Sequence, residues 1–184
     1  MSLEDKIIDY KNHVSDIEHW VALKGEFRYE SIIRFLNEKG IECSWENVTY
    51  YIKYDKRLLI NSFKYIVFLE EMYKSFIYKY GDNKNMKKKN FQNAYYEFLL
   101  LGHIAEFDGV SLSNMKLYKK SINLFRNKVV HNNILIGQKF NGYSLEEVLK
   151  QFITILPESY RNGFVKDINS CSTGILDNKW HITL

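Results

Sequence analysis

The segment from Arg57 to Tyr80 carries an unbroken stripe of apolar side chains at helical spacing that is about six turns long, and Gly81 ends it. The other apolar runs are also long and widely spaced, and the chain contains only nine Gly and one Pro to form turns. This pattern disfavours a sandwich or barrel of many short strands. We therefore predict an all-α fold, a bundle of about seven helices.

Capping residues and apolar periodicity indicate where the other helices lie. Gly40 stands where a left-handed helix end is expected, and Ser44 is placed to cap a helix that begins at Trp45. The sequence Ser144-Leu145-Glu146-Glu147 matches a capping box. The remaining predicted helices cover residues 4–23, 29–36, 94 to about 108, 113–137 with Ser113 as cap, 144–156, and 157–168 with Pro157 in the first turn.

The composition fits one folded domain. Of the 184 residues 46% are hydrophobic and 26% are charged, which excludes a disordered chain and allows a core without disulfides. We expect a single domain over residues 1–184, with N-terminal helices in 1–80, further helices in 90–171, and a tail, 172–184, that is frayed or strand-like. The lysine-rich segment between Gly81 and Asn90 is predicted to be a loop.

Cysteine usage, the N-terminus and the charge give weaker constraints. Cys43 and Cys171 stand far apart and outside any Cys/His ligand spacing, so we expect no metal site and no cofactor, and a reducing compartment. No signal-peptide pattern and no apolar run of about 18 residues is present, so we expect a cytoplasmic protein that does not enter a membrane. The net charge of +4 is compatible with a polyanionic partner.

One short stretch, Phe125-Arg126-Asn127-Lys128-Val129-Val130-His131-Asn132-Asn133, stands out for its chemistry. It brings a permanent cation, an amide and a titratable imidazole within six residues near the end of a predicted helix. On an ideal helix Asn127 and His131 share a face, whereas Arg126 and His131 are about 140° apart. Arg126 must therefore reach round the helix, or the helix must loosen near His131.

This arrangement resembles the RNxxxH motif of HEPN-domain ribonucleases, which are helical-bundle proteins common in toxin–antitoxin and antiphage systems. Requiring Asn directly after Arg at this spacing reduces chance occurrence in a chain of this composition to on the order of 1%. The resemblance implies that Arg126, Asn127 and His131 form a catalytic site for RNA. It also implies a homodimer in which the motif helices of two subunits form one basic cleft.

A second resemblance covers Glu46 to Tyr80, which looks like the N-terminal helical region of Abi-like abortive-infection proteins. Those sequences carry an aromatic-Asp-x-Arg-Leu element, followed by an Ile-Glu pair and an Arg. The matching positions here are Tyr54, Asp55, Arg57 and Leu58, then Glu70 or Glu71, and finally Lys74, which stands where Arg is usual. The two resemblances together imply a toxin or phage-defence effector, with an antitoxin protein as a further partner.

The chemistry of metal-independent RNA cleavage agrees with these residue types. A base must take the proton of the 2′-hydroxyl, a cation must stabilise the charge on phosphorus, and an acid must protonate the leaving oxygen. His131 fits the base or the acid, Arg126 fits the cation, Asn127 orients His131 or donates to phosphate, and Lys128 is a candidate RNA contact. One histidine cannot perform both proton transfers at once, so the chemistry also favours a dimer.

Two other hypotheses remain open. In the first, the chain is a catalytically inactive HEPN-like bundle that binds RNA, a nucleotide or a protein partner. In the second it is a structural scaffold, in which Arg126 neutralises a carboxylate and His131 makes unrelated contacts. Several further residues are expected to be structural: His103 and the tyrosines Tyr50, Tyr51, Tyr54, Tyr95 and Tyr96 in the core, Asp55 with Arg57 and Glu70 with Lys74 as ion pairs, and Lys84 and Lys87–Lys89 in a solvated loop.

Overall fold

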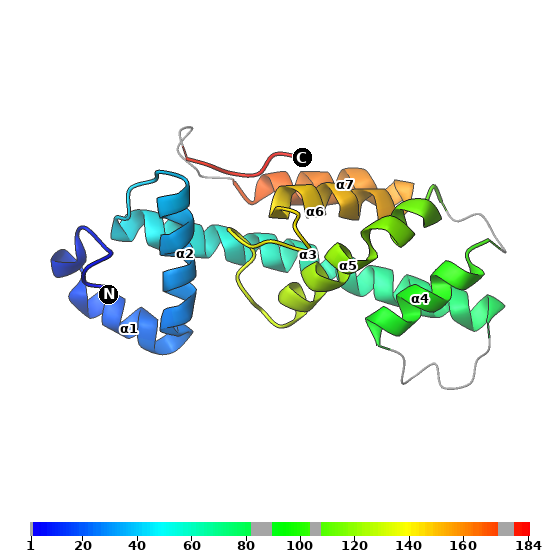
Figure 1. Ribbon diagram of the computed structural model, residues 1–184, viewed down its shortest axis with the longest axis horizontal. Coiled ribbons are helices and arrows are strands. Elements are labelled where there is room, and N and C mark those ends of the chain that lie inside the picture. Colours follow the sequence, from blue (N-terminus) through cyan, green and yellow to red (C-terminus); the bar gives the residue numbers. More distant parts are fainter. Residues whose placement is uncertain (1, 82–89, 104–107, 173–178) are drawn as a thin grey trace.

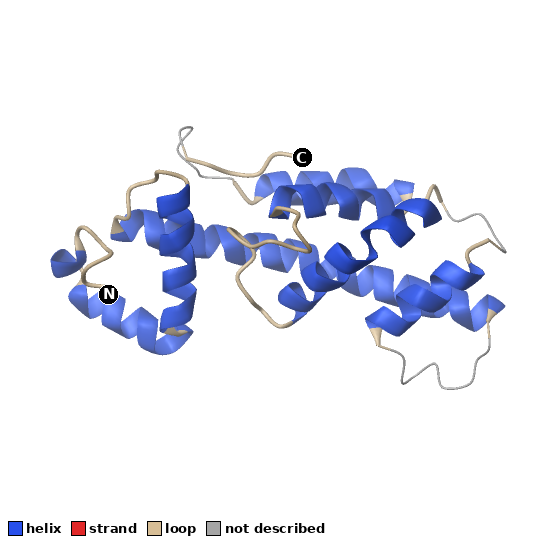
Figure 2. Cartoon of the chain, in the orientation of Figure 1, coloured by secondary structure: helices blue, strands red, loops and turns tan. Residues whose placement is uncertain are grey.

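A computed structural model of the chain describes residues 2–81, 90–103, 108–172 and 179–184. Seven α-helices, a short 3₁₀-helix and no strand run through these residues (Figures 1 and 2), which confirms the all-α prediction. In chain order they are η1 (Tyr10–Asn12), α1 (Val14–Lys24), α2 (Glu26–Glu38), α3 (Trp45–Tyr80), α4 (Phe91–Leu101), α5 (Leu112–Val130), α6 (Leu145–Ile155) and α7 (Glu158–Ser170).

The long helix α3 is the element on which the others assemble. Its 36 residues correspond to a length of about 54 Å, and α2, α4, α5 and α7 all contact it. In Figure 1, α1 and α2 lie at one end of α3 and α4 lies at the other, while α5, α6 and α7 lie along its middle. The apolar stripe of α3 is therefore buried along nearly its whole length, from Trp45 to Ile77.

Helix α3 includes the apolar stripe predicted for residues 57–80 and extends without a break to Trp45 on its N-terminal side. The helix begins where the sequence predicted, because Ser44 Oγ accepts a hydrogen bond from the amide of Asn47 at 3.3 Å. Gly81 follows its last residue, as expected. Gly40 has a φ of 65°, so the predicted left-handed end of the preceding helix is also confirmed.

The predicted helix over 4–23 was wrong in its first part. Only α1 is α-helical there, and it begins at Val14. The preceding residues bond to the start of α3 instead: Asp9 Oδ1 accepts from the amide of Trp45 at 2.8 Å, and the amide of Ile8 donates to the carbonyl of Cys43 at 3.1 Å. These tertiary bonds outcompete the local helical ones.

The bounds of α4 and of α7 also differ from the prediction. Helix α4 ends at Leu101, well before Asp108, so His103 lies beyond the helix and is exposed rather than in the core. The predicted member Ile104 and the lysines at 84 and 87–89 lie outside the described residues. Pro157 precedes α7 as its N-cap instead of occupying its first turn.

Helix α5 differs from the prediction at both ends. It begins after Ser111 rather than Ser113, because Ser111 Oγ accepts from the amide of Asn114 at 3.2 Å. It ends at Val130 and does not reach Gly137, because Asn132 takes a φ of 55°, a left-handed conformation that stops a right-handed helix. The motif histidine therefore stands at the helix end.

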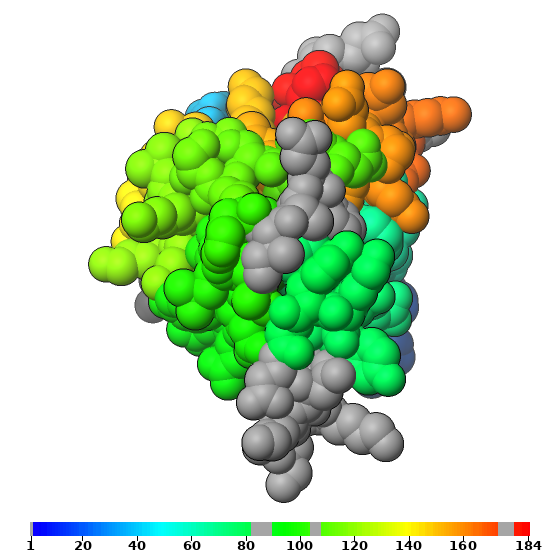
Figure 3. Space-filling view, turned by 90° about the vertical axis from the view of Figure 1, so that its right-hand side faces the viewer, coloured from blue at the N-terminus to red at the C-terminus, as the bar shows by residue number. Residues whose placement is uncertain are grey.

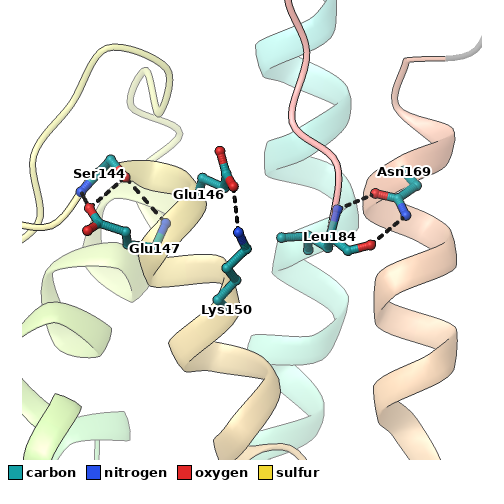
Figure 4. A network of polar contacts seen from close by, with 6 residues as sticks. All are labelled: Ser144, Glu146, Glu147, Lys150, Asn169 and Leu184. Carbon is teal, nitrogen blue, oxygen red and sulfur yellow. Dashed lines mark hydrogen bonds and ion pairs between the residues drawn. The ribbon is translucent and has the colours of Figure 1, made fainter.

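The C-terminal residues are packed without forming a helix or a strand, which corrects the expectation of a frayed or strand-like tail for 179–184. Ile182 is buried, and its amide donates to Tyr54 Oη at 2.8 Å. Figure 4 shows Asn169 bonding both the amide and the carbonyl of Leu184, at 2.9 and 3.2 Å. The same figure shows the predicted capping box of α6, in which Ser144 and Glu147 bond reciprocally.

A buried carboxylate joins α3 to the loop that follows α5. Asp55 Oδ1 accepts from the amides of Leu135 and Ile136 at 2.8 and 2.9 Å, and all three residues are fully buried. From the sequence, Asp55 was expected to pair locally with Arg57. Burial raises the pKa of Asp55 to about 6, although both amide hydrogen bonds and the charges of Arg28 and Lys56 act to lower it.

The raised pKa of Asp55 predicts a pH-dependent stability. The folded protein holds the proton of Asp55 more tightly than the unfolded chain, in which the pKa is near 3.8. The protonation of Asp55 therefore adds fully to the free energy of unfolding below about pH 4. This contribution, up to about 3 kcal/mol, is lost as the pH rises to about 6. Urea unfolding at several pH values should show this loss in the wild type and not in Asp55→Asn. Parallel pH profiles of the two proteins would contradict it.

Candidate functional site

The motif residues lie at the C-terminal end of α5. Arg126, Asn127 and Lys128 are among the last five residues of the helix, and His131 is its C-cap residue. The amide of His131 still donates to the carbonyl of Asn127, at 3.0 Å. The backbone thus stays nearly helical up to His131, and the side chains of Asn127 and His131 project from the same face of α5.

Arg126 points inward, toward α3 and α4. Its Nη2 lies 3.5 Å from Glu70 Oε2, and its guanidinium carbon lies 5.5 Å from the centre of the Phe91 ring. Its Nη1 donates to Asn127 Oδ1 at 3.2 Å. Only 20% of the side chain is exposed, and the buried Nε has no hydrogen-bond partner among the described residues. The guanidinium is therefore held on three sides.

Glu70 is the anion that organises this inner part of the site. Its Oε1 also accepts from Lys74, one helical turn later, at 2.7 Å, which confirms the predicted Glu70–Lys74 ion pair. Of the two candidate glutamates, Glu70 is the one at the site, while Glu71 is exposed on another face of α3. Glu70 thus links the segment that resembles the Abi-like proteins to the motif helix.

His131 points outward at the end of α5. It is exposed, and within the described part of the chain no hydrogen bond or ion pair engages its ring. The structure therefore brings Arg126 and Asn127 together, whereas no contact joins Arg126 to His131. Lys128 is engaged elsewhere, because its Nζ donates to Gln138 Oε1 at 3.1 Å in the loop that follows α5.

A groove of about 1090 Å³ lies between α4 and α5, and Asn127, four residues before His131 in the chain, is one of its lining residues. In Figure 3, α4 (green) and α5 (yellow-green) lie side by side on the face turned to the viewer. Tyr96, expected in the core, is 36% exposed in this groove, with Lys119 Nζ 3.5 Å from the centre of its ring. The other lining side chains are mainly exposed leucines and lysines of the two helices: Leu100, Leu117, Leu124, Lys116 and Lys120.

A second hollow has a volume of about 720 Å³ and is lined in part by Asn132, the residue after His131, and we call it the basic pocket. Asn132 forms one wall, and none of the described residues that line it is acidic. Arg28 Nη2 donates to the carbonyl of Asn132 at 2.7 Å, and Lys56 Nζ donates to its Oδ1 at 2.8 Å. Its charged lining residues are Lys24 from α1, Arg28 from α2, and Lys53, Lys56 and Arg57 from α3.

The basic pocket was not predicted from the sequence. A signal was present in part, because Lys53, Lys56 and Arg57 are spaced three and four residues apart and so lie on one face of a helix. Lys24 and Arg28 carry no such signal, since only the turn between α1 and α2 brings them to this face of α3.

Comparisons of the chain with protein-family models, with curated proteins and with solved structures find no match. Among the described residues, no three His, Cys, Asp or Glu side chains gather as a candidate metal site. No helix in that part of the chain is both long and apolar enough to cross a membrane.

The partners of Glu70 predict unequal effects of mutations at this site. Replacing Glu70 with Gln removes the charge that faces the mostly buried guanidinium of Arg126, and should lower the free energy of unfolding by about 1–2 kcal/mol. Lys74→Ala should cost less than about 0.5 kcal/mol, because it breaks an i,i+4 pair within one helix and leaves Glu70 its contact with Arg126. Glu71→Gln is the matched control on the exposed face. Equal effects of all three changes in urea unfolding would contradict the assigned role of Glu70.

Proposed function

We propose that this protein is a metal-independent endoribonuclease of the HEPN type that works as a homodimer. The observation that carries the proposal is the Arg126-Asn127-x-x-x-His131 spacing at the end of a helix in an all-α fold, with His131 exposed and its chain neighbours Asn127 and Asn132 lining a groove and a pocket of cations. By the same resemblance we propose a role as toxin or phage-defence effector, with an antitoxin protein as a further partner.

In the proposed reaction, each motif residue has a part in 2′-hydroxyl attack. Neutral His131 takes the 2′-hydroxyl proton as the 2′-oxygen bonds to phosphorus, and the bond from phosphorus to the 5′-oxygen breaks. His131 of the partner subunit, in its protonated form, gives a proton to that 5′-oxygen. The products are a 2′,3′-cyclic phosphate and a 5′-hydroxyl end.

Arg126 and Asn127 complete this arrangement. Because Asn127 Oδ1 accepts from Arg126, the amide group of Asn127 remains available to donate to a phosphate oxygen. Arg126 thus orients Asn127, and its charge stabilises the negative charge that develops on the phosphate oxygens. Glu70 and Phe91 hold the guanidinium in place for both tasks.

The exposed face of α5 offers a surface for the second subunit. Leu117 and Leu124 precede His131 at intervals of seven residues, so the three side chains lie in one row along the helix. The two leucines are 69% and 45% exposed. A second copy that packs on this row would bury them and bring its own His131 to the same cleft.

A second candidate function is favoured by the contacts of Arg126. Its ion pair with Glu70 matches a structural role, and His131 does not touch it. A catalytically inactive HEPN-like bundle that binds RNA, a nucleotide or a protein partner would also explain this geometry. The two functions differ in whether RNA is cut.

Cleavage of RNA tests the proposed function directly. Purified protein should cut a mixed-sequence RNA in the presence of EDTA, and the fragments should carry 2′,3′-cyclic phosphate ends detectable by mass spectrometry. His131→Ala and Arg126→Ala should each lower the rate at least about 100-fold, the range expected for loss of a general acid–base group or a charge-stabilising group. The exposed His19 of α1, changed to Ala, is the matched control. Cleavage that EDTA abolishes, or that survives in both variants, would overturn the nuclease assignment.

The oligomeric state tests the arrangement of subunits. Analytical ultracentrifugation should show a dimer of the wild type at micromolar concentration and a monomer of Leu124→Glu, because a charge on the α5 row cannot be buried without a partner. The monomer should also lose cleavage, since it lacks the second His131. Ile60→Glu, on an exposed position of α3, serves as control and should stay dimeric. A monomeric wild type that still cuts RNA would contradict this arrangement.

A further inference from the structure

Four of the five cations that line the basic pocket have no carboxylate partner among the described residues. Within the described part of the chain, Lys24, Arg28, Lys53 and Lys56 form no ion pair with a carboxylate. The nearby carboxylate, Asp55, is fully buried and turned to the loop amides. Burial, followed by the charges of Arg28 and Lys53, lowers the pKa of Lys24, which shows that these cations repel one another.

The position of the pocket relates it to the motif histidine. Arg28 and Lys56 hold Asn132 through its carbonyl and its side chain, and Asn132 follows His131 directly in the chain. Consecutive Cα atoms are about 3.8 Å apart, so the pocket wall and the base of the His131 side chain are neighbours. An anion bound to Arg28 and Lys56 would therefore lie beside His131.

The lining of the pocket also fits more than a bare anion. Leu23 and Ile52 add apolar surface beside the cations, and the volume of about 720 Å³ lies in the range of sites that hold a nucleotide-sized ligand. Cations placed around apolar side chains match a nucleic-acid strand, which presents charged phosphates next to flat, weakly polar bases.

We propose that the basic pocket binds the phosphate backbone of a single-stranded RNA, which then reaches His131 across Asn132. The proposal rests on RNA as the substrate and deepens the proposed function by adding a binding subsite on α1, α2 and α3. This subsite is separate from the groove between α4 and α5. Arg28 and Lys56 have two tasks there: they position the loop beside His131, and they contact the strand.

RNA binding, measured without cleavage, tests the pocket. The His131→Ala protein is titrated against a fluorescein-labelled single-stranded RNA of about 12 nucleotides, and binding is followed by fluorescence anisotropy at several salt concentrations. Adding Lys24→Glu and Lys53→Glu should weaken binding at least about tenfold and should flatten the salt dependence by roughly one to two units of slope. Both lysines are exposed and leave the bonds of Asn132 intact. Circular dichroism confirms that the variant remains helical.

A matched variant controls for net charge. Lys150→Glu with Lys166→Glu changes the charge equally at exposed positions on α6 and α7 and should alter affinity less than about twofold. Equal losses in the two double variants would overturn the pocket as an RNA subsite. ATP is added as a competitor. Displacement of RNA only at millimolar ATP supports the binding of single-stranded RNA in the pocket. Displacement at micromolar ATP would assign the pocket to a free nucleotide instead. Because the readout is binding, a failure of the proposed nuclease activity would appear separately, as absent cleavage by the wild type.

Discussion

The hydrogen bonds from the loop amides of Leu135 and Ile136 to Asp55 are the interaction on which the candidate site depends. A fully buried carboxylate must be hydrogen-bonded, so these bonds fix the loop after α5 against the middle of α3. Further along α3, Glu70 holds the last turn of α5 through Arg126. Helix α3 thus binds the motif segment at Arg126 and at Leu135–Ile136, and His131 lies between these two positions in the chain.

Electrostatics divides the end of α5 into an inner and an outer part. Inside, the single negative charge of Glu70 faces the two positive charges of Arg126 and Lys74, so this part keeps a net charge of +1. Outside, His131 faces solvent near the basic pocket, where Lys24, Arg28, Lys53 and Lys56 form no ion pair with a carboxylate in the part of the chain that the structure describes. The unbalanced charge lies where a polyanion would have to approach the imidazole, and this arrangement connects the proposed chemistry with the proposed subsite.

The sequence predicted elements that depend on local signals and failed where distant contacts decide. The start of α3 at Ser44, the left-handed Gly40 and the capping box at Ser144 were confirmed, because each is a bond or conformation within a few residues. Apolar periodicity overextended α5 to Gly137, since buried loop residues such as Ile134 and Ile136 mimic a helical stripe. His103 was likewise misplaced, because α4 stops before it.

The sequence by itself determined the all-α class, the long helix α3 and the position of the Arg126-Asn127-x-x-x-His131 motif near a helix end. Only the tertiary structure decided that Arg126 turns to Glu70, that His131 is left exposed, and that five cations from three helices meet beside it. The physical reason is separation along the chain. Helix periodicity and capping act over three to seven residues. Glu70, Leu135 and Lys56, which bond to Arg126, Asp55 and Asn132 respectively, each lie more than 50 residues from their partner and meet it only when the helices pack.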